Sequence, residues 1–205
     1  MVSSEEYEVN TTACVYGGDA LARLPDGRAV FIPYALPDEQ LQIRLVEEKE
    51  RYARGEISEI IKPSPHRIEP RCPHFQECGG CHYQHIPYPE QLLIKESILL
   101  DQFRRVGKLD SAPVKPIQPS PSPWNYRNHL QFHIAEDGRL GFLKHRSNEI
   151  VTIQECHLPE ESLNEIWPSF KLEFIPGLDR VSLRAGDGGQ DALVLFESQG
   201  QEMFE

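Results

Sequence analysis

The chain has 205 residues and a mass of 23.5 kDa, with 39% hydrophobic and 26% charged residues, which is typical of a soluble protein of one to three small domains. No run of 18 apolar residues occurs, and the acidic N-terminus lacks the apolar stretch of a secretory signal, so the sequence predicts a cytoplasmic protein without a membrane segment. The net charge of −11 argues against a generic nucleic-acid-binding protein. The charge is uneven, however: residues 111–150 hold five basic and three acidic side chains, whereas residues 151–205 hold three and eleven.

The first third of the chain predicts a small β domain. Tyr7, Val9, Thr11 and Ala13 alternate with their neighbours, as in a half-buried strand. Four more short runs follow, separated by turn residues: 20–24, 28–33, 40–46 and 52–61. Five short strands spaced by turns favour a small barrel, and its acidic surface leaves a purely accessory, structural role as an alternative.

The middle of the chain predicts one helix between two linkers. Residues 62–65 and the proline- and serine-rich residues 109–123 have linker composition. Residues 89–106 have the helical pattern, with Gly107 where a C-cap belongs. The apolar residues that fall close to one helical face are Leu92, Leu93, Leu99, Leu100 and Phe103.

From Trp124 onward the pattern is again β. A hairpin is predicted over 130–143, a strand over 149–153, a short helix over 159–167, and a second hairpin with strands 179–185 and 192–197. The second hairpin turns at Gly186-Asp187-Gly188-Gly189. This segment lacks the third glycine of a dinucleotide-binding loop and joins two strands, so it predicts a turn rather than a cofactor site.

Four of the five cysteines predict a metal or cluster site. Cys72, Cys78 and Cys81 lie in the run C-x₅-C-G-G-C, and Cys156 follows a predicted strand far along the chain. Three thiolates on one loop and one remote thiolate suit a [4Fe–4S] cluster. Structural zinc is the alternative, with a histidine in place of a cysteine; the candidates are His74, His82, His85 and His157. The remaining Cys14 lies in a predicted strand and is expected to be a buried apolar side chain.

The cysteine run, a five-stranded barrel before it and a remote cysteine after it resemble the RNA (uracil-5-)-methyltransferase family. The family also carries runs similar to Ser64-Pro65-His66-Arg67, to His85-Ile86-Pro87-Tyr88 and to Trp124-Asn125-Tyr126-Arg127-Asn128. The resemblance implies a fold that is mainly β with some α. It implies an OB-like TRAM barrel over 1–62, an iron–sulfur loop and helix over 63–108, and a small antiparallel α+β central domain, incomplete here, over 109–205.

The resemblance also implies what the chain does. The family methylates C5 of uridines in ribosomal or transfer RNA with S-adenosylmethionine, in a Rossmann-like domain that we do not find in these 205 residues. We therefore expect no catalytic residue and no S-adenosylmethionine-binding residue here. The expected function is an RNA-binding portion that is inert by itself and whose cluster, held by Cys72, Cys78, Cys81 and Cys156, is structural rather than redox-active.

Candidate RNA contacts lie in the only stretch with a basic balance. They are Tyr126, Arg127, Lys144, His145 and Arg146, with Trp124 as a further stacking surface or a core residue. Where the family often carries Lys or Arg after the Tyr-Arg pair, this chain has Asn128 and His129, which lowers the local charge. The expected partner is RNA, rRNA rather than tRNA, bound by a monomer. The alternative is a stand-alone iron–sulfur or zinc module that binds RNA or senses redox state without enzymatic activity.

Overall fold

The computed structural model describes residues 5–170, 172, 177–186, 188 and 191–198. The chain divides into two compact units. We call residues 1–70 and 82–119 the barrel unit, and residues 71–81 and 120–205 the sheet unit. The cysteine loop and the helix, which were predicted as one segment, thus belong to different units: the loop to the sheet unit and the helix to the barrel unit.

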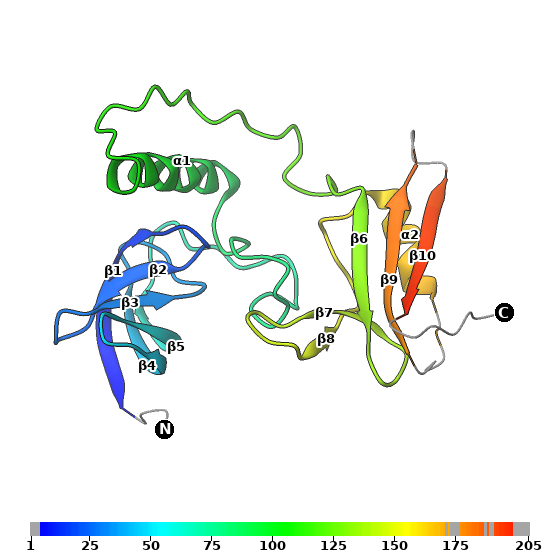
Figure 1. Ribbon diagram of the computed structural model, residues 1–205, viewed down its shortest axis with the longest axis horizontal. Coiled ribbons are helices and arrows are strands. Elements are labelled where there is room, and N and C mark those ends of the chain that lie inside the picture. The colour runs from blue at the N-terminus through cyan, green and yellow to red at the C-terminus, as the bar shows by residue number, and fades with distance from the viewer. Residues whose placement is uncertain (1–4, 171, 173–176, 187, 189–190, 199–205) are drawn as a thin grey trace. The chain divides into compact units, whose positions relative to one another are not determined.

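The barrel unit contains a closed five-stranded barrel in the order β1-β2-β3-β5-β4 (Figure 1). Its strands are β1 (Glu6–Cys14), β2 (Ala20–Arg23), β3 (Ala29–Ile32), β4 (Gln40–Glu48) and β5 (Tyr52–Lys62). The neighbours pair antiparallel except β3 and β5, which are parallel and close the barrel. The five predicted strands and the barrel are confirmed.

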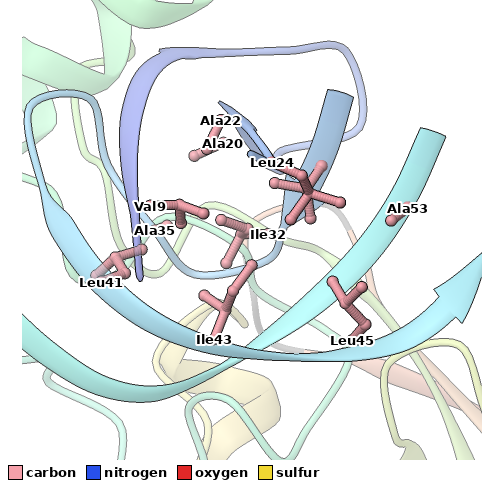
Figure 2. Close-up of a cluster of buried hydrophobic side chains, with 11 residues drawn as sticks. Val9, Ala20, Ala22, Leu24, Ile32, Ala35, Leu41, Ile43, Leu45 and Ala53 are labelled. Atoms are coloured by element: carbon pink, nitrogen blue, oxygen red, sulfur yellow. The ribbon is translucent and has the colours of Figure 1, made fainter. Parts of the chain in front are cut away.

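The barrel core is made of small and branched side chains that converge on the axis (Figure 2). Val9, Ile32, Leu41, Ile43 and Leu45 are all at most 2% exposed. One predicted register is wrong: Tyr7, Val9 and Thr11 follow the inward alternation, but Ala13 is exposed and Cys14 is buried in its place. The cause is a register shift between Thr11 and Ala13 where β1 pairs with β2, because an extra residue in a strand moves the following side chains to the other face.

A buried ion pair holds the chain where it leaves the barrel. The Glu39 side chain is 0% exposed and receives two hydrogen bonds from the Arg67 guanidinium, at 2.6 Å from Nε and 2.8 Å from Nη2. The backbone N–H groups of Leu36 and Ser64 donate to the same carboxylate. Burial raises the pKa of Glu39, but these hydrogen bonds outweigh burial and hold it below its ordinary value.

The helix α1 (Tyr88–Arg105) packs on the barrel unit through a face other than the leucine-rich one. Ile94 is its buried residue and contacts a cluster with Cys14, Leu36 and Ile86. Leu93, Leu99 and Leu100 are instead 61%, 45% and 42% exposed. The leucine spacing indicated the helix correctly but not its buried side, because the loop that carries Ile86 packs against the side of Ile94.

The sheet unit contains a five-stranded antiparallel sheet in the order β10-β9-β6-β7-β8. Its elements are β6 (His129–Ile134), β7 (Leu140–Leu143), β8 (Ile150–Thr152), α2 (Glu161–Ile166), the 3₁₀ turn η1 (Trp167–Ser169), β9 (Leu178–Ala185) and β10 (Ala192–Ser198). Figure 1 shows α2 against one face of this sheet, and the core beneath it contains Phe132, Leu163, Trp167 and Val181. The predicted antiparallel α+β arrangement is confirmed.

The second predicted hairpin is also confirmed. Ala185 of β9 pairs with Ala192 of β10, and the Gly186 N–H donates to the Asp191 carbonyl at 2.7 Å. Asp187 and Gly189 of the predicted turn lie outside the described residues. No helix in the described part of the chain is long and apolar enough to cross a membrane.

We expect Arg67→Ala to destabilise the barrel unit by about 3–5 kcal/mol, because it leaves the buried Glu39 carboxylate without its cation. Glu39 has a depressed pKa in the folded chain, so the stability that its charged form contributes is present above the unfolded pKa and is lost as the pH falls through the folded pKa. The cost of Arg67→Ala should therefore shrink in acid. Hydrogen exchange of the β1 and β4 amides measures it.

Arg28→Ala is the matched control. Arg28 pairs with Asp26 and Glu48 on the surface of the same barrel, and loss of such surface pairs changes the free energy of unfolding little. Equal effects of the two substitutions on the barrel amides would contradict a special role for the buried pair.

Candidate functional site

The cysteine loop is fastened to the sheet unit through its backbone and one histidine. The Gly79 N–H donates to the Leu143 carbonyl at the end of β7 at 2.9 Å, and Cys78 forms an isolated antiparallel bridge with Lys144. The Gln154 N–H donates to His74 Nε2 at 3.0 Å, which ties the loop to the segment that precedes Cys156. These contacts fix the loop beside β7 and β8.

Gly79 is required by this close approach. A Cβ added at Gly79 would lie 2.8 Å from the Leu143 carbonyl oxygen, closer than real Cβ atoms come, and 3.0 Å from the His145 backbone nitrogen. The Gly80 N–H donates instead to Cys78 Sγ at 3.4 Å. The two adjacent glycines thus serve different purposes, since one allows backbone contact and the other presents an amide to a thiol.

The structure brings the four predicted ligand cysteines into one electrostatic neighbourhood. All four are partly buried free thiols. Burial, with smaller contributions from the nearby Cys81, Cys72 and Cys78, raises the pKa of the Cys156 thiol to about 11. Burial likewise raises the pKa values of Cys72 and Cys78, again with a contribution from Cys81. Like charges oppose one another's ionisation only at short range, so these four thiols lie near one another.

The spacing of these side chains differs from that of a single-ion site. No three His, Cys, Asp or Glu side chains of the described residues are grouped closely enough to hold one metal ion. A cuboidal cluster takes one thiolate at each of several irons, so its ligands need not converge on a point as those of a zinc ion do. Four cysteine thiols match the donor set that iron–sulfur clusters take. A carboxylate is also nearby, because Glu155 contributes to the raised pKa of Cys72.

The alternative ligands make other contacts. His74 accepts a hydrogen bond through Nε2. His82 lies against Gly18 in the barrel unit, where a Cβ at Gly18 would be 3.1 Å from His82 Cβ. His85 is 1% exposed, and burial lowers its pKa to about 4. Cys14 is buried as predicted, and burial raises the pKa of its thiol to about 12, which suits an inert core side chain.

An aromatic contact that the sequence did not reveal joins the neighbours of two cysteines. The Arg71 guanidinium lies over the Trp124 ring, 5.5 Å from its centroid. The His157 ring meets Trp124 edge-on, with centroids 6.0 Å apart and an interplanar angle of 82°. Arg71 precedes Cys72 and His157 follows Cys156. The only signal in the sequence was that Arg71 and His157 each adjoin a candidate ligand cysteine, and this does not predict that Trp124 lies between the two side chains.

The candidate RNA contacts fall into two groups. Lys144, His145 and Arg146 lie in the predicted turn between β7 and β8, where the Ser147 N–H donates to the Lys144 carbonyl. Tyr126 is 53% exposed, whereas Arg127 is partly buried and close enough to Cys78 to lower the pKa of that thiol against the stronger effect of burial. The basic turn therefore lies beside the cysteine loop, and Arg127 lies within electrostatic reach of Cys78.

Comparison with known proteins agrees with this architecture. Residues 5–58 match the TRAM domain family. The chain is 37% identical to an uncharacterized RNA methyltransferase of Aquifex aeolicus, over 89% of this chain and 43% of that protein. It is also 37% identical to the 23S rRNA (uracil(1939)-C(5))-methyltransferase RlmD of Methylococcus capsulatus, over 85% of this chain and 40% of that protein.

A solved structure has a similar fold. The tRNA (uracil-54, C5)-methyltransferase of Pyrococcus abyssi, in complex with S-adenosyl-L-homocysteine, matches 95% of this chain and 46% of its own, with a TM-score of 0.60 and 23% sequence identity. The chain thus spans less than half the length of these relatives. Because of its TRAM domain and these relatives, the chain belongs to the RNA (uracil-5-)-methyltransferase family and corresponds to the N-terminal part of the family's members.

Proposed function

We propose that the chain is the RNA-binding, [4Fe–4S]-bearing part of an S-adenosylmethionine-dependent RNA (uracil-5-)-methyltransferase. The observation that carries the proposal is that Cys72, Cys78, Cys81 and Cys156 lie within electrostatic reach of one another in the sheet unit of a chain with a TRAM barrel. Methyl transfer and S-adenosylmethionine binding are assigned to the part of the relatives' length that this chain does not span.

The cluster would be held by these four cysteines and would supply a covalent cross-link between two distant stretches of the chain. Residues 71–81 and Cys156 are separated in sequence by α1, the proline-rich segment and β6 to β8. The thiols must lose their protons to bind metal, and their raised pKa values make this a coupled step, so metal binding contributes to folding and depends on pH. A structural role follows from this arrangement.

RNA would be bound by the barrel and by the basic turn at 144–146. Lys144 is about half exposed, and its ammonium lies 3.8 Å from the Glu149 carboxylate, a distance at which a surface pair contributes little and can exchange for a phosphate. Arg146 is exposed and has a φ of 56°, held by the turn. Tyr126 supplies an exposed aromatic face for stacking on a base.

Serine substitution at each cysteine tests the cluster. Anaerobically purified chain should contain four irons and four sulfides. Cys72→Ser, Cys78→Ser, Cys81→Ser and Cys156→Ser should each lose most of the iron and sulfide, since a serine hydroxyl is a poor replacement for a thiolate. Iron, sulfide and zinc analysis per chain measures this.

Cys14→Ala is the control for these variants, because Cys14 is buried in the core of the barrel unit, whereas the four candidate ligands belong to the sheet unit. It should keep the full iron content. One zinc per chain without sulfide would contradict the cluster and favour a zinc scaffold.

Charge reversal in the basic turn tests RNA binding. Lys144→Glu and Arg146→Glu should each weaken binding of a labelled stem-loop RNA with a uridine-rich loop and lower the salt dependence by about one phosphate contact. Arg139→Glu is the matched control, since Arg139 is an exposed arginine of the same sheet unit whose Nε pairs with Asp137 at 2.7 Å. An equal loss in the control would mean that overall charge, not this turn, determines affinity.

A further inference from the structure

Trp124 is anchored firmly to the segment that follows Cys156. The residues after Trp124 run parallel to residues 157–160: the Asn125 N–H donates to the His157 carbonyl at 3.0 Å, and the Arg127 N–H donates to the Leu158 carbonyl at 2.9 Å. The Glu160 N–H donates back to the Arg127 carbonyl, and the Asn125 side-chain amide donates to the Pro159 carbonyl at 2.8 Å. The backbone at Trp124 therefore moves with the Cys156 side of the site.

The Trp124 ring, in contrast, reaches the Cys72 side. One of its faces carries the Arg71 guanidinium at 5.5 Å, and Arg71 is bonded directly to Cys72. Among cation–π interactions, a cation over the face of a tryptophan ring is the strongest. It depends on the aromatic face and would not be replaced by an aliphatic surface. His157 supports the ring edge-on from the Cys156 side.

These contacts give the ring a bridging position. The far end of the cysteine loop is already fixed by the Gly79 hydrogen bond to Leu143, and its middle by His74. The beginning of the loop, at Arg71, is held by Trp124. We propose that Trp124 is a positioning residue that sets the distance between Cys72 and Cys156 through Arg71 and His157, and that it is not a base-stacking surface for RNA.

The competing role for Trp124 is stacking on an unpaired base. Stacking needs an open ring face, and a base on the face that Arg71 covers would have to displace the guanidinium. The neighbouring Tyr126, at 53% exposure, offers an aromatic side chain without this requirement. The observations thus separate the two aromatic residues of one short segment into a positioning residue and an RNA-contact candidate.

The test compares Trp124→Ala, Trp124→Phe and the control Tyr126→Ala in the cluster-bearing chain. Anaerobic loss of the visible cluster absorbance after addition of an iron chelator should be about ten- to a hundred-fold faster in Trp124→Ala, the range typical of removing a residue that orients metal ligands. Trp124→Phe keeps an aromatic face for Arg71 and should recover part of the difference, which a loss of packing volume alone would not predict. Tyr126→Ala should match the wild-type rate.

Arg71→Ala adds a second criterion. If Arg71 acts through Trp124, the double variant Arg71→Ala/Trp124→Ala should lose the cluster no faster than Trp124→Ala. Additive effects of the two substitutions, or a wild-type rate in Trp124→Ala, would overturn the proposal. Weaker binding of the stem-loop RNA by Trp124→Ala with an unchanged rate of cluster loss would also overturn it, in favour of base stacking.

This proposal rests on the proposed function, because the cluster is the group whose ligands Trp124 positions. A measurement on metal-free chain tests the role of Trp124 separately from the presence of the cluster. Alkylation of Cys72 and Cys156 in chelator-treated chain, followed by mass spectrometry, should be about tenfold faster in Trp124→Ala than in wild type, because the beginning of the loop is then no longer held. If the wild-type chain contained no iron, the proposed cluster would be wrong. If Cys72 and Cys156 were alkylated at equal rates in the two metal-free chains, the positioning role of Trp124 would be wrong.

Discussion

The candidate site depends on the contact between the cysteine loop and the end of β7. The Gly79 N–H binds the Leu143 carbonyl, and the space at Gly79 admits no side chain. This contact places Cys78 beside Lys144 and brings the loop to the sheet that carries Cys156 after β8. Together with the His74 hydrogen bond and the Arg71 contact, it fixes the three thiols of the loop relative to Cys156.

The elements of this fold were predictable from local chemistry. Asp26-Gly27 and Asp137-Gly138 are turn signals with a mechanism, because Gly27 and Gly138 have φ values of 89° and 78° and each aspartate accepts the N–H two residues later. These turns separated strands whose apolar alternation then indicated a barrel and a sheet. The inward face of β1 was predicted correctly only to Thr11, because a shift in strand pairing leaves no mark in the alternation itself.

Tertiary contacts were less accessible to sequence. The helix α1 has apolar residues on more than one side, so its leucines could not show that Ile94 is the buried residue. The cysteine spacing identified the four candidate ligands. No spacing in the sequence predicts the contact at Gly79 or the contacts of Trp124 with Arg71 and His157, because each joins residues far apart in the chain. The family resemblance implied that the four cysteines hold a cluster, and the structure showed which contacts position the cysteine loop.

The same loop that carries the thiols also sets the position of the basic turn. His145 contacts Gly79 through its backbone, and Lys144 is bridged to Cys78, so Lys144 and Arg146 project from a turn whose other side is the cysteine loop. A displacement of the loop must therefore displace the two cations or break its hydrogen bond to β7. Under the proposed function, a cluster on these thiols would fix the loop on one side of the turn while the other side presents charge to RNA. Contacts to phosphates set the position and orientation of a protein on RNA, so such a cluster would affect RNA binding without taking part in a catalytic step.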